Sequence, residues 1–111
     1  MTYRVVFTDA ALQDLDEIAD TISNFQRVRQ ALTVAREIRK RVETLKVFPD
    51  RGVHLPELVD LGAGSTMDYR QLHWKPYRIV YFVSDSVVKI MLIADGRRDM
   101  PALLMKRLVR P

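Results

Sequence analysis

Two adjacent arginines near the end of the chain are the residues best suited to chemistry. Arg97 and Arg98 lie in the segment IADGRRDM, with Asp95 before them and Asp99 after them. An arginine side chain presents a planar fork of N–H donors that fits phosphate and carboxylate groups. The pair could therefore assist chemistry at a phosphate, bind an anionic partner, or simply neutralise the two aspartates. The other candidate cations of this half of the chain are Arg70, His73, Lys75, Arg78 and Arg107.

The histidine and cysteine content limits the metal binding and the acid–base chemistry that the chain can support. The chain contains no cysteine and two histidines, His54 and His73, which are not spaced as a metal-binding pair. We therefore expect no bound metal and no cofactor. His73 lies among the candidate cations, and histidine exchanges protons near neutral pH, so His73 is the candidate acid or base. Neither a phosphate-binding loop nor the Gly-x-Ser-x-Gly pattern of serine hydrolases occurs.

Charge is distributed unevenly along the chain. Residues 1–68 contain nine Lys and Arg against eleven Asp and Glu, a net charge of −2. Residues 69–111 contain nine Lys and Arg against three Asp and Glu, a net charge of +6. This asymmetry predicts that the C-terminal part meets an anionic partner. Solvated charge without a function is the alternative explanation.

Length and composition indicate one globular domain over residues 1–111. The chain has 111 residues and 48% hydrophobic residues, which suffices for one modest core. The N-terminus lacks the charged start and apolar stretch of a signal peptide. No apolar run approaches the roughly 20 residues that a membrane helix needs. We therefore expect a cytoplasmic protein that does not enter a membrane.

The first half of the sequence predicts one strand and two helices. Residues 2–7 alternate in polarity as a half-buried strand does. From Ala10 the apolar residues recur at helical spacing on one stripe as far as Ile22, and a second stripe covers residues 27–46. The first helix is acidic and the second is basic, which predicts an antiparallel hairpin with charge pairing across its edges.

The second half predicts strands. Residues 47–58 contain prolines and a glycine and indicate an irregular connection, and residues 59–67 indicate a loop. Strands are expected at 69–74, 76–83 and 87–94, followed by a short helix capped by Asp99. The order β-α-α-β-β-β plus a short C-terminal helix predicts an α+β fold. In it, a small antiparallel sheet packs against an N-terminal helical hairpin.

This topology predicts that six of the candidate residues meet at one end of the sheet, namely Arg70, His73, Lys75, Arg78, Arg97 and Arg98. In a hairpin with a short turn, residue 78 is expected to pair near residue 92. The arginine pair then runs on toward the level of His73 and Lys75. Aromatic residues beside these cations could stack on nucleic-acid bases, and they are Tyr69, Trp74 and Tyr77.

A purely structural role is the alternative for several of these residues. Arg78 shares its strand face with apolar side chains and could bind backbone carbonyls or Asp68. Tyr77 and Tyr81 alternate with other core-forming positions, which is also typical of buried residues. Trp74 could simply fill the edge of the sheet.

The ordered set of segments resembles the RelE/ParE superfamily of toxins from type II toxin–antitoxin modules. The resemblance covers about residues 3–108, and PYRIVY followed by DGRRD is its most specific part. It implies a small antiparallel sheet packed against an N-terminal helical hairpin. RelE-like members are ribosome-dependent mRNA endonucleases, whereas ParE-like members poison DNA gyrase. Both kinds are neutralised by a small antitoxin that wraps the toxin, which implies a toxin–antitoxin hetero-oligomer.

The resemblance also assigns expected roles to individual residues. Arg78 and Arg98 match positions where RelE-like nucleases carry arginines that assist catalysis. Leu104 stands about where such nucleases carry a catalytic tyrosine, and Tyr69 and Gln71 replace lysines of some members. His73 remains as the side chain for proton transfer, as in family nucleases that use a histidine on this strand.

These departures favour a ParE-like toxin that binds gyrase and has no active site of its own. The alternative is a RelE-like mRNA endonuclease that uses Arg78, Arg98 and His73. The expected anion- or target-binding residues are Arg70, Lys75, Arg97 and Arg107. A third possibility is a toxin-derived module that retains the fold and the antitoxin contacts but has little toxicity. The antitoxin is expected on the outer face of the helical hairpin or on the open edge of the sheet.

Overall fold

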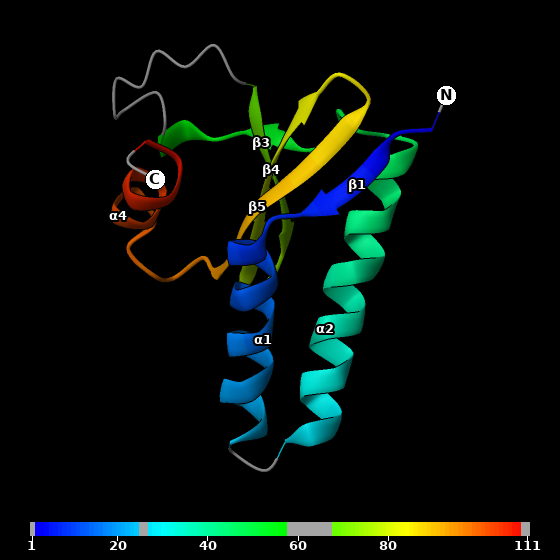
Figure 1. Ribbon diagram of the computed structural model, residues 1–111. Helices are drawn as coiled ribbons and strands as arrows, with labels where there is room; N and C mark the ends of the chain where they lie inside the picture. Colours follow the sequence, from blue (N-terminus) through cyan, green and yellow to red (C-terminus); the bar gives the residue numbers. More distant parts are fainter. Residues whose placement is uncertain (1, 25–26, 58–67, 110–111) are drawn as a thin grey trace.

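The protein consists of a β-sheet with a helical hairpin packed on one face and a short helix packed on the other (Figure 1). The computed structural model describes residues 2–24, 27–57 and 68–109. It confirms the predicted α+β fold, in which an N-terminal helical hairpin packs against a mostly antiparallel sheet. The loop expected at 59–67 lies outside the described residues.

Helices α1 (Asp9–Ser23) and α2 (Val28–Glu43) form the predicted hairpin. The Thr8 hydroxyl caps α1 by accepting a hydrogen bond of 3.1 Å from the backbone N–H of Ala11. The predicted second helix ends at Glu43 and continues as a 3₁₀ turn, Thr44–Lys46. The buried residues of the two helices are Ala11, Leu15, Ala31, Ile38 and Val42, and all of them except Ala31 belong to the core that the hairpin forms with the sheet.

Charge pairing across the hairpin is not observed. Among the described residues, no ion pair joins α1 to α2, and the pair on α2 runs within that helix from Arg41 to Glu37. Exposed ion pairs contribute only about 0–1 kcal/mol. The apolar stripes therefore hold the hairpin in place.

Five strands form the sheet in the order β1-β5-β4-β3-β2. Their bounds are β1 Arg4–Phe7, β2 Val53–His54, β3 Tyr69–Trp74, β4 Tyr77–Ser84 and β5 Val87–Asp95. All neighbours are antiparallel except β1 and β5, which run parallel. The two-residue β2 lies in the segment for which an irregular connection was expected. Its pairing with β3 is long-range, and two residues are too few to give a strand pattern.

A bulge in β5 sets the register at the functional end of the sheet. Val80 pairs with Leu92 and Tyr81 pairs with Ile90, so Met91 is an extra residue between them. Arg78 lies opposite Ala94, two residues beyond its predicted partner. The bulge accounts for one residue of this shift, and the turn, across which Ser84 pairs with Val87, accounts for the other.

The sheet buries both of its faces. Under the hairpin, the core includes Ile79, Tyr81 and Ile90. On the opposite face, Val80, Phe82 and Leu92 pack with Met100 and Leu104 of the C-terminal helix.

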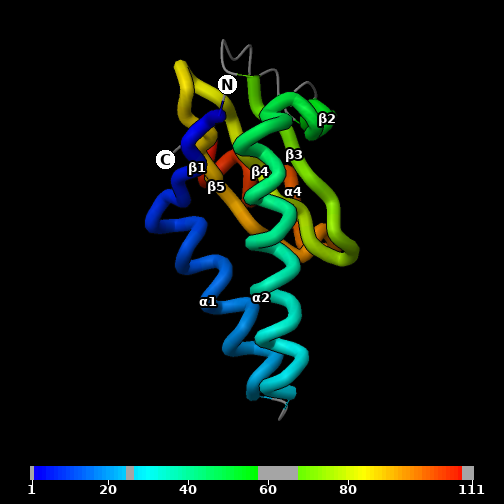
Figure 2. The backbone as a smooth tube through the Cα atoms, turned by 90° about the vertical axis from the view of Figure 1, so that its right-hand side faces the viewer, coloured from blue at the N-terminus to red at the C-terminus, as the bar shows by residue number. Residues whose placement is uncertain are grey.

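That helix, α4 (Met100–Leu104), begins where the sequence predicts. The Asp99 carboxylate accepts the N–H of Ala102 at 3.2 Å, and a π-helical turn, Met105–Val109, follows the helix. Figure 2, turned by 90° from Figure 1, shows the hairpin in front of the sheet and α4 behind it.

The hairpin is longer than the sheet that it covers. In both views the far ends of α1 and α2 extend past the end of the strands (Figures 1 and 2). The turn of the β3–β4 hairpin and the end of β5 lie at this same end of the sheet. A step therefore forms between the helices and the strand ends.

Candidate functional site

Arg78 is a buried, fully engaged side chain. It projects from β4 to the face of the sheet that α4 covers, and it is 8% exposed. Its guanidinium donates to both carboxylate oxygens of Glu57, at 2.6 and 2.9 Å, and its Nε donates to the side-chain oxygen of Gln71. The hydrogen bond from Arg78 lowers the pKa of Glu57 below its usual range. The guanidinium therefore already holds an internal anion.

Gly96 leaves room for the Arg78 side chain. A Cβ atom at this position would lie 3.1 Å from Arg78 Cδ and 3.2 Å from Arg78 Cγ. The glycine of the DGRRD segment therefore serves the close approach of this arginine.

His73 lies directly opposite Arg78 in the β3–β4 pairing and is exposed. Facing residues of an antiparallel pair point to the same side of the sheet. The structure therefore brings together two of the three residues expected for RNA cleavage.

Arg98, the third of those residues, lies elsewhere. It is exposed beyond the end of β5, and within the described part of the chain it has no ion pair. It lines a groove on the hairpin side of the strand ends, and neither Arg78 nor His73 lines that groove.

The neighbouring Arg97 is exposed but paired. Its guanidinium binds Asp95, with an Nη2–Oδ2 distance of 2.6 Å, and its backbone N–H donates to the same carboxylate. The hydrogen bond from Arg97 lowers the pKa of Asp95. One of the two aspartates of IADGRRDM thus neutralises Arg97, while the other, Asp99, caps α4.

Arg70 does not join the other cations, and that part of the predicted convergence is wrong. It pairs opposite Tyr81, away from the turn end of the β3–β4 hairpin. Its guanidinium binds Asp68 at 3.0 Å and donates to the backbone carbonyls of Asp50 and Gly52. These contacts secure the segment that leads into β2. Arg70 ends up distant because it lies three residues before His73 along β3, farther from the β3–β4 turn and on the other face of the sheet.

Arg107 is engaged with the first helix. It donates to both carboxylate oxygens of Asp14, at 2.9 and 3.0 Å, and to the carbonyl of Met91. The hydrogen bond with Asp14 raises the pKa of Arg107 further. Asp14 also accepts the backbone N–H of Ile93 at 3.0 Å. This contact ties the C-terminal segment to α1 and to β5.

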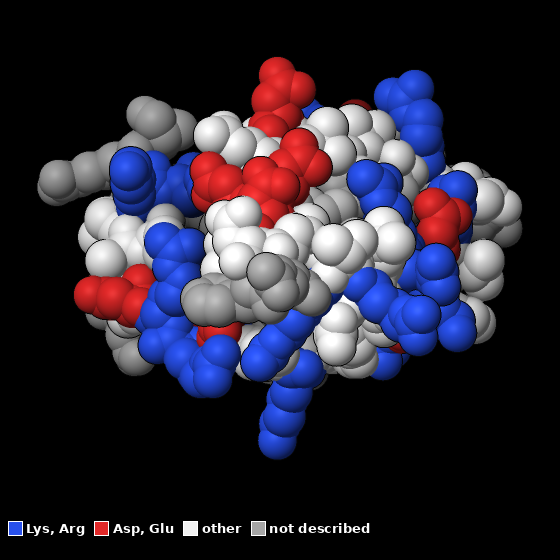
Figure 3. Space-filling view, turned by 90° about the horizontal axis from the view of Figure 1, so that it is seen from below, with Lys and Arg blue, Asp and Glu red and all other residues white. Residues whose placement is uncertain are grey.

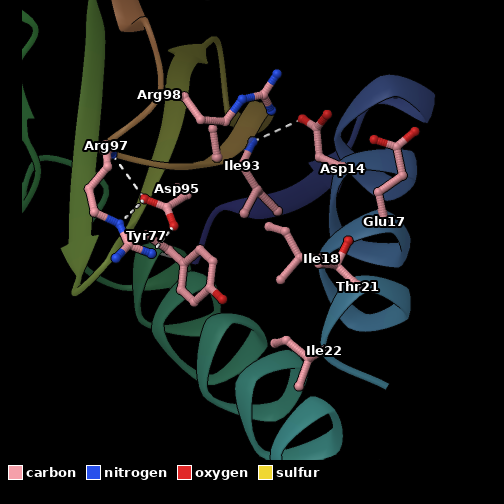
Figure 4. Close-up of a pocket in the computed structure, with 11 residues that line it drawn as sticks. Asp14, Glu17, Ile18, Thr21, Ile22, Tyr77, Ile93, Asp95, Arg97 and Arg98 are labelled. Carbon is pink, nitrogen blue, oxygen red and sulfur yellow. Dashed lines mark hydrogen bonds and ion pairs between the residues drawn. The ribbon is translucent and has the colours of Figure 1, made fainter. Parts of the chain in front are cut away.

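Between α1 and the ends of β4 and β5 lies a groove of about 410 Å³, which we call the β5-edge groove. Ile18 and Ile22 form its wall on α1, and Tyr77 and Ile93 form its wall on the sheet (Figure 4). Glu17 lines the helix side and Arg98 lines the strand side. This volume falls within the range of pockets that accept ligands.

The aromatic residues are not free to stack on bases. Tyr69 is 9% exposed and packs edge-on against Phe82, with ring centroids 5.4 Å apart. Trp74 and Tyr77 stack on each other at 6.1 Å, and the Arg41 guanidinium lies 5.1 Å from the Trp74 ring. The structural alternative is therefore the better description of these rings.

The sequence alone missed three partners of the candidate cations. Glu57, Gln71 and Asp14 hold Arg78 or Arg107, and all three pairings join distant parts of the chain. A buried arginine needs a counter-charge. This rule implies that a partner exists, but it does not show which residue that partner is.

In residues 2–24, 27–57 and 68–109, no group of three or more His, Cys, Asp or Glu is arranged to hold a metal ion. None of the helices described is long and apolar enough to span a membrane.

Comparison with known protein families identifies the family to which the sequence is similar. The family model described as "ParE toxin of type II toxin-antitoxin system, parDE" matches residues 5–100. A search among curated proteins finds no match.

Two solved structures share the fold. A chain of the chromosomal ParDE TA system from P. aeruginosa has a TM-score of 0.66 and 20% identity, over 85% of this chain and 96% of its own. The E. coli toxin RelE, solved as a mutant in the free state, has a TM-score of 0.60 and 18% identity, over 97% of this chain and 99% of its own. At these identities the likeness concerns the fold alone.

Proposed function

Because the chain belongs to the ParE toxin family of type II toxin–antitoxin systems, we propose that it arrests growth by binding and inhibiting DNA gyrase. A cognate antitoxin neutralises it in a cytoplasmic toxin–antitoxin hetero-oligomer. The protein cuts no nucleic acid itself in this proposal. Family membership supports the toxin and the antitoxin partner, and the state of Arg78 supports the choice of target.

The ion pair between Arg78 and Glu57 is the observation that carries this choice. A nuclease arginine must offer N–H donors to the phosphate that accumulates charge in the transition state. The Arg78 guanidinium instead donates its hydrogen bonds to Glu57 and Gln71. Moving an RNA phosphate into its place would leave the Glu57 carboxylate beside a second anion, which is electrostatically unfavourable.

Proton transfer is the second argument. Cleavage of a phosphodiester through the ribose 2′-hydroxyl needs both a proton acceptor and a proton donor. The chain has no Tyr, His or Trp after Tyr81. His73 and the Glu57 carboxylate both lie beside Arg78, but the hydrogen bond from Arg78 lowers the pKa of Glu57 and makes it a poor proton donor. His73 would therefore have to supply the proton to the leaving group.

The exposed cations are the proposed contacts to the target. Lys75, Arg97 and Arg98 are exposed at the end of the sheet where β4 begins and β5 ends. Arg70 and Arg107 are committed to internal carboxylates and carbonyls, so we propose that they stabilise the fold.

A ribosome-dependent mRNA endonuclease is the second candidate function. The position of His73 opposite Arg78 favours it. In that case Glu57 would have to release Arg78 when RNA binds.

The proposal is tested by two assays that are carried out in parallel. The purified protein is added to gyrase with plasmid DNA, and accumulation of cleaved DNA–gyrase complexes is scored. The same preparation is added to ribosomes programmed with mRNA. Gyrase complexes with intact mRNA are expected, whereas site-specific mRNA cuts with gyrase unaffected would refute gyrase as the target.

A further inference from the structure

The outer face of the helical hairpin, which points away from the sheet, carries two rows of exposed polar side chains. On α1 the acidic row lies opposite the buried stripe and consists of Asp9, Gln13, Asp16 and Asp20. On α2 the basic row lies opposite the buried stripe and consists of Arg29, Thr33, Arg36 and Lys40. Both rows repeat at intervals of four, three and four residues, so they match each other in length and spacing.

Neither row is neutralised within its own chain. In the part of the chain that the structure describes, none of the charged side chains of the two rows forms an ion pair, although α1 and α2 pack together. Asp16 and Asp20 are like charges four residues apart, and such pairs destabilise a helix. The same holds for Arg36 and Lys40. A surface of opposite charge over each row would offset both repulsions.

Exposed apolar side chains lie between the two rows. Leu12 is 38% exposed, and Val28 and Leu32 are each 59% exposed. Leu12 lies on the flank of α1 opposite the one that lines the β5-edge groove, and therefore on the flank that faces α2. Val28 and Leu32 lie on the flank of α2 opposite Arg41, whose guanidinium lies over the Trp74 ring, and therefore face α1. An occupant of this face would bury an apolar strip between two charged rows.

The separation of charge indicates which occupant fits. In the view from the hairpin end, acidic side chains gather over α1, with basic ones on both sides of them (Figure 3). A nucleic acid or an anionic lipid surface would meet the acidic row as well as the basic row, which is unfavourable. A complementary partner needs a basic half and an acidic half at the same separation. A second copy of this hairpin has both.

A two-fold axis parallel to the helices brings two such faces together correctly. It places α1 of one copy over α2 of the other, and the reverse, so that acidic rows meet basic rows at both places. All neighbouring helices are then antiparallel. A two-fold axis across the hairpin would instead place α1 on α1 and set like charges against each other.

The positions along the hairpin agree with this arrangement. Because α1 ends at Ser23 and α2 begins at Val28, residues near these ends lie at the tip of the hairpin. The start of α1 and the end of α2 lie near the sheet (Figure 1). An axis parallel to the helices preserves these levels. The contacts expected between the two copies are Asp9 with Lys40, Asp16 with Arg36, and Asp20 with Arg29.

We infer that two copies of the protein associate through the outer faces of their hairpins. Val28 and Leu32 pack near the two-fold axis against the same residues of the other copy. Each face is about 24 Å long and about 20 Å wide. The dimer therefore buries about 1,000 Å² in total, which is at the lower end of specific interfaces. The inference goes beyond the proposed function and does not depend on gyrase as the target.

Sedimentation of the purified wild-type protein over a range of concentrations gives the first test. A reversible equilibrium between monomer and dimer is expected. Since salt screens exposed charges, higher ionic strength should shift the equilibrium toward the monomer. A protein that sediments as a monomer at every concentration overturns the inference, as does a dimer that salt does not weaken.

A substitution in the apolar strip tests the location. Leu32→Glu places two carboxylates together near the axis and is expected to weaken dimerisation at least tenfold. Phe48→Glu is the matched control, because Phe48 is 64% exposed but lies outside the hairpin, and it should change dimerisation less than threefold. Weakening by Phe48→Glu alone overturns the inference. A monomeric wild type whose antitoxin binding Leu32→Glu weakens also overturns it, and assigns the face to the antitoxin.

An exchange of charges tests the pairing of the rows. Asp16→Arg and Arg36→Asp each set like charges against each other, so each variant alone should dimerise at least tenfold more weakly. An equal mixture of the two variants forms a heterodimer in which both contacts are again complementary, and it should dimerise within threefold of wild type. Glu17→Arg reverses an exposed carboxylate on the groove side of α1 and should have less than a threefold effect.

The mixture also separates pairing from folding. Each chain in it still carries its own substitution, so recovery cannot come from restored folding. Thermal melting establishes that each variant is folded before mixing. Two folded variants that remain monomeric when mixed overturn the inference.

Discussion

Arg78 and Glu57 form a two-point ion pair, with nitrogen–oxygen distances of 2.6 and 2.9 Å. The pair joins the central strand β4 to the segment after β2, and its side chains are 9% and 19% exposed. The resemblance to RNA-cleaving toxins implies that an arginine at this position assists catalysis. Its occupation by an internal carboxylate instead gives it a structural role.

Removal of Glu57 should destabilise the fold. Glu57→Ala leaves the buried guanidinium without its counter-charge, so we expect the free energy of unfolding to fall by about 1–3 kcal/mol. Urea denaturation measures the change. Glu43→Ala serves as the control, because the Glu43 side chain is 60% exposed in its pair with Lys46. An equal effect of the two substitutions would show that the buried pair is unimportant.

The same pair should make stability depend on pH. The hydrogen bond from Arg78 lowers the pKa of folded Glu57 below its ordinary value of 4.5. A carboxylate with a lowered folded-state pKa stabilises the fold above its unfolded-state pKa. That stabilisation is lost as the pH falls through the folded-state pKa. The stability advantage of wild type over Glu57→Gln should therefore be full above about pH 4.5 and shrink below it. Denaturation at a series of pH values checks this, and a constant difference would contradict it.

Tyr81 should contribute through its hydroxyl as well as its ring. The hydroxyl donates to the Pro49 carbonyl at 2.7 Å and accepts the Gly52 N–H at 2.9 Å, inside the core. Tyr81→Phe leaves both groups unsatisfied, and we expect a loss of about 1–3 kcal/mol. Tyr77→Phe is the matched control, because no hydrogen bond of its hydroxyl occurs in the described structure. Equal urea midpoints for the two variants would argue against this role.

Asp14 should hold the C-terminal segment. Asp14→Ala removes the two-point contact with Arg107, whereas Asp16→Ala changes an exposed carboxylate on the same helix. Loss of about 1.4 kcal/mol from a local contact corresponds to a tenfold change in an opening equilibrium. Amide exchange after α4 should therefore accelerate about tenfold in Asp14→Ala only. Unchanged exchange would mean that the apolar contacts of α4 suffice.

His73 should be dispensable for toxicity. In the proposed mechanism no proton is transferred at this residue, so His73→Ala should arrest growth as wild type does. Growth is measured after induction, with and without the antitoxin. A His73→Ala variant that folds normally but has lost its toxicity would instead support RNA cleavage.

The parts of the fold that follow from local pattern could be predicted from the sequence. Alternating polarity marked β4 and β5, helical spacing marked the hairpin, and Asp99 indicated the N-terminal cap of α4. These signals arise from neighbouring residues, which one sequence displays directly.

The site required information that only the fold supplies. Met91 shifts the register of β5 by a bulge, Glu57 reaches Arg78 across 21 residues, and Asp14 reaches Arg107 across 93 residues. Each of these depends on long-range packing. The sequence therefore shows which residues carry positive charge but could not indicate which of them internal carboxylates already neutralise.

Supercoiling of relaxed plasmid DNA by purified gyrase is the most direct test of the central claim. Gyrase is titrated with the wild-type protein, and with the protein preincubated with its antitoxin. The account predicts a dose-dependent loss of supercoiling that the antitoxin prevents. Full supercoiling at a large excess of a folded, growth-arresting protein would contradict it.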